Sequence, residues 1–366
     1  VNHFSALFNK KNEVELSWAP VKDSLEATAM PDHYIVYKRI GNGDFDNGTV
    51  VKKNSYTCTI PTDVVVSFKV TALNKGGESF PSEVLSVGIN SKATARPVLV
   101  INGFDRLSAP DDFVSADDAE AGFLAENDNG VSYQQLISYV GKMKEFRRAI
   151  PWTHDDAAGF GDSYGNYEGK IIAGNTFDYP ALHGSSILNA GYSFCSIGRS
   201  ALNTFEGKLP QALKPLTGEA CQSAFSAIDL ILGKQKQSKF GRPGLHPLSF
   251  KTFDETMQNF LTAYCKAGGA VFVSGSYVGT DLWQNPLNYP ATNPYAEYFK
   301  KNEKTDKDFA RNILKYQWRE DRASNTGRVA YVASPLSEKN TAVRYYNVPN
   351  DKSYVVESPD AIDPAD

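Results

Sequence analysis

Apolar and polar residues follow one pattern over residues 1–92 and a different pattern after them. In the first part, short runs such as residues 13–18 and 33–38 alternate with a period of two, and turn-forming residues separate the runs. Such alternation is typical of strands that place one face in a core and the other in solvent. The regular spacing of the runs predicts an antiparallel β-sandwich.

From Pro97 onward, predominantly apolar runs alternate with stretches of helical periodicity. The apolar runs are residues 98–101, 170–173, 192–195, 228–232, 270–273 and 329–332. The helical stretches are residues 132–148, 250–266 and 306–318. Apolar runs are typical of strands covered on both faces, so residues 97–366 are predicted to form an α/β domain with a doubly wound, mostly parallel sheet. Residues 107–130 and 151–169 are interpreted as lids or insertions.

The stretch from Lys266 to Asp281 indicates where a site would lie. A helix stops at Gly268 and Gly269, an apolar strand follows, and a turn rich in Gly and Ser comes next. In parallel sheets with helices on both faces, ligands bind outside the carboxyl ends of the strands. We therefore expect the functional residues just after the apolar runs.

Polar residues at these positions are expected to converge on one crevice that binds a polar ligand. Asp105, Asp178 and Asp281 are the catalytic candidates, because carboxylates in different environments can divide into an acid and a base. Asp281 is the predicted centre of the site. The alternative is structural, since Asn and Asp side chains in such turns also cap helices or bind the loop backbone, and Asp281 could cap a helix at residues 282–283.

Eight further residues are predicted to bind the ligand. The cationic ones would hold anionic groups, the aromatic ones would stack on sugar rings, and three others complete the set. They are, in that order, Arg106, His183 and Lys234; Tyr277 and Trp283; and Asn102, Asn175 and Ser276.

Sharper catalytic motifs are weak or missing. Residues 161–163 (Gly-Asp-Ser) resemble the nucleophile block of the GDSL esterases, but a loop and not a strand precedes them. A nucleophile elbow is absent, because Tyr277 occupies the middle position of residues 275–279. His154, Asp155 and Asp156 with the nearby Asp162 could supply calcium ligands, yet their spacing matches no calcium motif and a solvated acidic loop is favoured. No metal and no cofactor is expected.

Composition narrows the partners. The chain has 366 residues, a net charge of −4 and no run of Lys and Arg, which argues against a nucleic-acid partner. No apolar stretch approaches the roughly 18 residues needed to cross a bilayer. The four cysteines lack CxxC spacing and are interpreted as buried free thiols, with a disulfide or metal role as the alternative. The chain begins at Val1 and not at Met, so further domains of the same polypeptide are expected.

The first 92 residues resemble a fibronectin type III module. Trp18 lies in the second predicted strand, and residues 68–82 follow the pattern F-x-V-x-A-x-N-x-x-G-x-S-x-P-S. Val66 departs from the family, which usually has a tyrosine there. The resemblance implies a spacer or docking module and a secreted, periplasmic or cell-surface protein.

The second part resembles the class I glutamine amidotransferase-like (flavodoxin-like) fold. Those enzymes place a cysteine in the turn that here contains Gly275, Ser276 and Tyr277, and a later His-x-Glu pair, whereas no histidine follows His246. The resemblance therefore implies the fold without that chemistry.

Nearly the whole chain resembles secreted bacterial envelope proteins labelled xanthan lyase or N-acetylmuramoyl-L-alanine amidase. This implies a domain that binds a glycan or peptidoglycan fragment or cleaves it as a hydrolase or lyase. The alternative is a non-catalytic scaffold or adhesion module whose hydrolase-like rim has degenerated. Side chains that converge on a site would favour the enzyme, and polar groups used on their own backbone would favour the scaffold.

Overall fold

The structure is a computed structural model. It describes residues 1–10, 12–20, 27–79, 81–104, 111–115, 120–124, 129–130, 137–140, 143–147, 162–163, 170–176, 179–202, 222, 224–233, 238–239, 248–275, 278–283, 296–320, 323, 328–330, 342–344 and 360–365.

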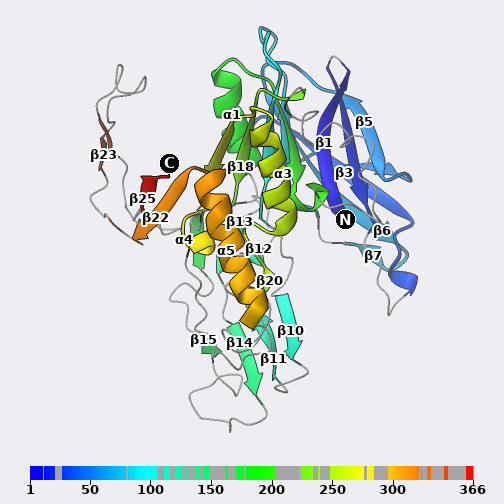
Figure 1. Ribbon diagram of the computed structural model, residues 1–366. Coiled ribbons are helices and arrows are strands. Elements are labelled where there is room, and N and C mark those ends of the chain that lie inside the picture. The colour runs from blue at the N-terminus through cyan, green and yellow to red at the C-terminus, as the bar shows by residue number, and fades with distance from the viewer. Residues whose placement is uncertain are drawn as a thin grey trace.

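The N-terminal part is an antiparallel β-sandwich, as the alternating pattern predicts (Figure 1). One layer consists of β1 (Asn2–Lys10), β2 (Glu13–Ala19) and β5 (Ser55–Thr59). The other layer consists of β3 (His33–Ile40), β4 (Thr49–Val51), β6 (Val65–Asn74), β7 (Gly77–Glu78) and β8 (Leu85–Gly88), and the short 3-10 helix η1 (Ala27–Ala29) joins the layers. Trp18 is buried between them, with its ring centroid 6.5 Å from that of Phe4 and 5.3 Å from that of Tyr34.

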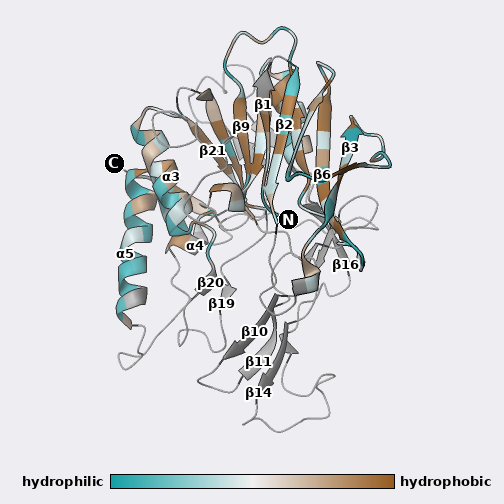
Figure 2. Ribbon diagram, turned by 90° about the vertical axis from the view of Figure 1, so that its right-hand side faces the viewer, coloured by the Kyte–Doolittle hydropathy of each residue, from teal (hydrophilic) through white to brown (hydrophobic). Residues whose placement is uncertain are grey.

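Four strands of the second part run parallel to one another. They are β9 (Val98–Asn102), β17 (Phe194–Gly198), β18 (Ala227–Ile231) and β21 (Val271–Ser274), in the spatial order β21-β18-β9-β17. Helix α1 (Tyr179–Asn189) packs on one face of this sheet. Helices α3 (Glu255–Lys266) and α5 (Ala296–Asn312) lie on the other face, where Leu261, Tyr264 and Phe309 join the core (Figure 2).

Strand β17 joins the parallel strands to the sandwich. One edge of β17 pairs with β9, and the other pairs with β8 at Phe194 and with β1 at Ser196 and Ile197. The fully buried Ser196 side chain completes this seam: its Oγ donates to the Ser86 carbonyl at 2.7 Å and accepts from the Ser86 amide at 2.9 Å. The result is one 12-stranded sheet that contains strands from both predicted domains, residues 1–92 and 97–366.

The remaining described elements are short. They are β10 (Asp111–Ser115), β11 (Glu120–Leu124), β12 (Asn129–Gly130), β13 (Ile137–Val140), β14 (Met143–Arg147), β15 (Asp162–Ser163), β16 (Lys170–Thr176), η2 (Arg199–Leu202), β19 (Ser238–Lys239), β20 (Leu248–Phe250), α4 (Thr280–Trp283), β22 (Tyr316–Glu320), β23 (Arg328–Ala330), β24 (Ala342–Arg344) and β25 (Ala361–Pro364).

Several predicted elements are wrong or shifted. The predicted helix at 132–148 contains strands β13 and β14, since β-branched and aromatic residues suit a strand as well as a helix face. The predicted strands at 170–173 and 329–332 fall in β16 and β23, which pair antiparallel in small separate sheets and not in the parallel one. Helix α3 begins only after Asp254, whose side chain caps it, and α5 ends at Asn312, before β22.

Strand β21 also differs from its prediction. The apolar run was expected to be covered on both faces, but Phe272 is 63% exposed. Strand β21 is at the end of the strand order, and only Val271 and Val273, which point to the opposite face, pack against the core. The expectation fails because apolar residues do not reveal that a strand lies at a sheet edge.

Two other expectations concern the whole chain. Among the described residues, no helix is long and apolar enough to cross a membrane. Cys58, Cys195 and Cys265 are free thiols, but only Cys195 of these three is buried, so the prediction of buried free thiols holds in part; Cys221 lies outside the described residues. Burial raises the pKa of Cys195 to about 12, which makes it a poor nucleophile.

Candidate functional site

The structure describes part of the predicted site. Six of the predicted residues lie outside the described residues, namely Asp105, Arg106, Asp178, Lys234, Ser276 and Tyr277. Convergence of the three catalytic carboxylates therefore stays a prediction. The described members are Asn102, His183 and Trp283, together with the backbones of Asn175 and Asp281.

The backbones of Asn175 and Asp281 are not where the pattern predicts. Asn175 lies within β16, which pairs antiparallel with β13, so it does not follow a strand of the parallel sheet. Asp281, the predicted centre of the site, is the second residue of α4 and therefore lies inside the helix that it would precede as a cap in the alternative interpretation.

His183 forms the most informative contact. Its Nδ1 lies 2.8 Å from Oδ2 of Asp229, a residue in the middle of strand β18. The side chain of Asp229 is 9% exposed and that of His183 is 23% exposed, so the pair lies just below the surface. Helix α1 positions His183 because Tyr179 and Gly184 bury its inner side against the sheet.

The contact with Asp229 indicates which nitrogen of the His183 imidazole carries a proton. An ionised carboxylate only accepts hydrogen bonds, so Nδ1 must carry the proton in the contact with Asp229. In the neutral ring, Nε2 then has a free lone pair, which can accept a proton or a hydrogen bond. A buried carboxylate that orients a histidine in this way is a recurring arrangement in sites where histidine acts as a base.

Asn102 adds a second unusual feature on the same face. It is the last residue of β9, lies beside Ile231 of β18 and is fully buried. Neither its side-chain nitrogen nor its oxygen has a hydrogen-bond partner among the described residues, and the same holds for Oδ1 of Asp229. Leaving a buried polar group unpaired costs about 1–3 kcal/mol, so such groups call for an explanation.

An aromatic pair closes the end of this region. The rings of Phe104 and Tyr179 meet edge to face with centroids 5.5 Å apart, which holds the start of α1 against the end of β9. Gly233 (φ +58°) lies against Phe104, and a Cβ there would be 3.1 Å from the ring. The chain after β18 therefore needs glycine at this position.

Trp283 lies apart from these residues. It packs on the core that faces α3 and α5, with the Arg311 guanidinium 4.8 Å from its ring centroid and the Tyr316 ring 6.4 Å away. The structure thus brings Asn102 and His183 to one face of the sheet and Trp283 to the other.

Sequence reasoning missed Asp229, although a signal was present. It is the one charged residue in the apolar run 228–232, and a charge in a buried strand is rare unless it has a partner. The run predicts a strand, but the prediction takes no account of Asp229 as a residue that needs a partner.

It also missed a polar cluster at the opposite face. Buried Arg199 donates to the carbonyls of Gly103 and Thr252, each at 3.1 Å, and forms an ion pair with Asp254 at 2.9 Å. Lys251 pairs with the buried Asp306. Burial raises the pKa of Asp306, while Lys251 acts in the opposite direction. The charged side chains of this cluster bind backbone carbonyls and one another, which indicates a structural role.

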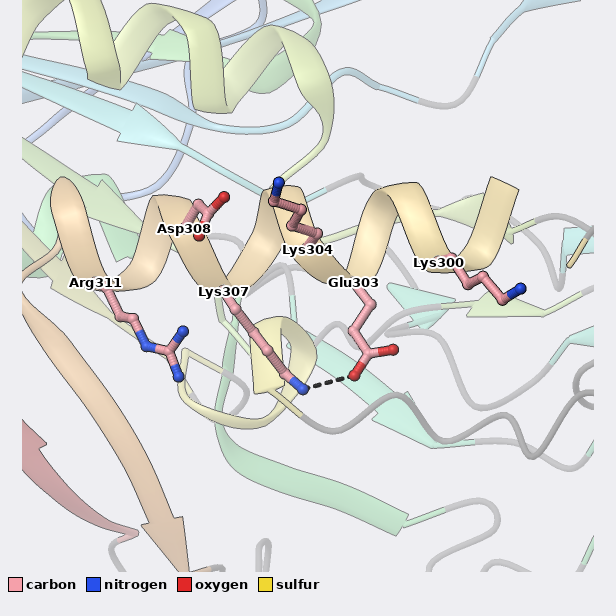
Figure 3. Close-up of a pocket in the computed structure, with 6 residues that line it drawn as sticks. All are labelled: Lys300, Glu303, Lys304, Lys307, Asp308 and Arg311. Carbon is pink, nitrogen blue, oxygen red and sulfur yellow. Dashed lines mark hydrogen bonds and ion pairs between the residues drawn. The ribbon is translucent and has the colours of Figure 1, made fainter. Parts of the chain in front are cut away.

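A hollow of about 280 Å³ lies along the outer face of α5. Its walls come from one helix, and the Glu303–Lys307 ion pair at 2.6 Å occupies part of it (Figure 3). The hollow is explained by the charged side chains of both signs that line a solvated helix face. Within the part of the chain that the structure describes, no group of His, Cys, Asp and Glu could hold a metal ion.

No family model and no curated protein matches the chain. Among solved structures it is similar to fibronectin type III domains. One from human contactin 1 is 13% identical over 25% of this chain and 78% of that chain, with a TM-score of 0.21. One from human fibronectin type III domain containing protein 3 is 25% identical over 22% and 78%, with a TM-score of 0.19.

The chain also matches the twitchin kinase region from C. elegans, at 21% identity and a TM-score of 0.20. That match covers 29% of this chain and spans only 17% of the other. None of these likenesses extends to the amidotransferase-like fold or to the lyase and amidase labels. The sandwich is established by the pairing of its strands and by its buried core.

Proposed function

We propose that the parallel strands belong to a doubly wound α/β unit whose ligand site lies between β9 and β18. In chain order the strands are β9, β17, β18 and β21, so their spatial order from β17 to β21 is 2-1-3-4. In sheets of this order the connections from the first and third strands leave in opposite directions, and ligands bind in the crevice between them. Asn102 on β9 and Asp229 on β18 belong to these two strands.

The ligand that we propose is a glycan or peptidoglycan fragment, bound or hydrolysed by a secreted cell-envelope protein. His183 would accept a proton or a hydrogen bond at Nε2, Asp229 would orient it, and the Asn102 amide would face a polar group of the ligand. The His183–Asp229 pair is the observation that supports this proposal most strongly. Asp105, Asp178 and Asp281 remain candidates for acid and base roles.

A non-catalytic scaffold is the second candidate. The Arg199 cluster favours it, because there the polar groups at the carboxyl end of β17 are used on their own backbone. The unpaired groups on the α1 face favour the enzyme instead. The two functions therefore differ in what His183 does.

The test is to incubate the protein with muropeptides and polysaccharide fragments, follow products by mass spectrometry and measure binding by calorimetry. If the protein is a hydrolase, His183→Ala should lower turnover by about 10²–10⁴-fold, the usual contribution of a general base. His33→Ala, in the sandwich strand β3, is the matched control and should change nothing. Binding without product, unchanged in His183→Ala, would support the scaffold and refute the enzyme.

A further inference from the structure

The face of the sheet that α1 occupies is only partly covered. Helix α1 packs against β6, β8, β9 and β17, and none of the described helices lies over β21 on this side. Phe272 of β21 points to this side, because Val271 and Val273 point to the core on the other side. With 63% of its surface exposed, it is one of the most exposed large apolar side chains among the described residues.

Phe272 is also the direct neighbour of Asp229. The two residues are paired in the register between β18 and β21, and Asp229 points to the same face because it meets His183 of α1. Adjacent strands are about 4.8 Å apart, so the Phe272 side chain lies beside that of Asp229. An exposed aromatic ring and an oriented histidine are therefore both next to Asp229, along one strip of this face.

This combination selects the chemistry of a ligand. The ring offers a flat apolar face, and Nε2 of His183, whose ring the same Asp229 orients, offers an acceptor on that face of the sheet. A pyranose has an apolar C–H face that can stack on an aromatic ring and hydroxyl groups at its rim that can donate to an acceptor. A purely apolar partner would cover Phe272 but would leave the oriented polar pair without a partner.

We propose that Phe272 is the stacking platform of a sugar subsite, in which a ring hydroxyl donates to Nε2 of His183. This inference rests on the proposed function, since it identifies the part of a glycan or peptidoglycan ligand that the site recognises. Asp229 is the positioning residue of the subsite, because it sets the tautomer of His183.

The experiment measures binding by calorimetry for three probes: the N-acetylglucosaminyl-N-acetylmuramic acid disaccharide, the disaccharide–peptide and the stem peptide alone. Phe272→Leu keeps an apolar edge residue but removes the flat ring. We expect the dissociation constants of both sugar-containing probes to rise about tenfold in Phe272→Leu, as for the loss of one aromatic contact. Phe272→Tyr keeps the ring and should bind them as the wild type does.

Val50→Ala is the matched control, because Val50 is an exposed apolar residue on the distant strand β4 and should not affect binding. Thermal unfolding of each variant checks that it is folded.

The outcomes separate the two proposals. If His183→Ala loses sugar binding while Phe272→Leu binds sugar as the wild type does, the proposed ligand site is supported and the role of Phe272 as a stacking platform is refuted. If none of the probes binds to the wild-type protein, both proposals fail. A subunit mass that depends on Phe272, with no sugar effect, would show that a second copy covers the strip and would overturn the subsite.

Discussion

The His183–Asp229 pair should contribute little to stability if it is retained for function, and replacing both members tests this. In His183→Leu, the carboxylate of Asp229, which is 9% exposed beside His183, loses the contact made at 2.8 Å. Losing a charge-assisted hydrogen bond costs about 1.5–3 kcal/mol. His183 is 23% exposed, so solvent reduces this to about 1–2 kcal/mol.

Replacing both residues has the opposite effect. The double variant His183→Leu/Asp229→Leu removes the buried charge and adds apolar surface next to Ile231 and Val100. Substituting a buried ion pair by apolar residues is often neutral or stabilising by about 1–4 kcal/mol. We therefore expect the double variant to be at least as stable as the wild type, and more stable than His183→Leu.

Urea unfolding followed by circular dichroism measures these free energies. The partly exposed pair Glu303–Lys307 on α5 serves as the control, because replacing both with Gln should change the free energy of unfolding by less than about 0.5 kcal/mol. A double variant that loses more than about 2 kcal/mol would show that the His183–Asp229 pair is structural, and would refute the reasoning.

Three more predictions follow from other parts of the structure. Ser196→Ala removes the hydroxyl that pairs with both the buried amide and the carbonyl of Ser86, so it should lower the free energy of unfolding in urea by about 2–4 kcal/mol. Ser5→Ala, which breaks one contact at 2.7 Å, should lower it by about 1 kcal/mol. Equal losses for the two variants would contradict the role of Ser196 in joining β17 to β8. Lys251→Met removes the cation beside Asp306, and burial already raises the pKa of this carboxyl. The folded state should then hold the Asp306 proton more tightly than the unfolded chain, so the free energy of unfolding in urea should fall as the pH rises through and above the usual range of a carboxyl group. A loss of stability that does not depend on pH would contradict this. Cys195, with a pKa of about 12, should resist iodoacetamide at pH 8 until the protein unfolds, and labelling of the native protein in mass spectrometry would show that it is accessible.

The elements that could be predicted are those that local patterns determine. Alternation over residues 13–18 and 33–38 identified β2 and β3, and the apolar runs identified β9, β17, β18 and β21. Pairing is different, because it depends on contacts between residues far apart in sequence. No local signal says that Ser196 meets Ser86, 110 residues away, or that β13 pairs with β16.

The candidate site could be predicted in part for the same reason. Asn102 ends a strand of the parallel sheet, so the rule about carboxyl ends of strands found it. His183 was predicted for a reason that does not hold, because the run before it forms β16, which lies outside the parallel sheet. Asp229 lies within a strand, and its role follows only from the packing of α1. Phe272 could not be recognised as exposed, because its exposure depends on β21 being an edge strand with no described helix over it.

The most direct test of the proposed site is nitrogen NMR of protein labelled with ¹⁵N-histidine, titrated with the disaccharide–peptide. The chain has five histidines, and His183→Ala assigns the resonances of His183. We predict that Nδ1 of His183 is protonated in the free protein and that only the His183 resonances shift on binding, with the larger change at Nε2. Resonances of His183 that stay unchanged at saturation would contradict a ligand site built on His183 and Asp229.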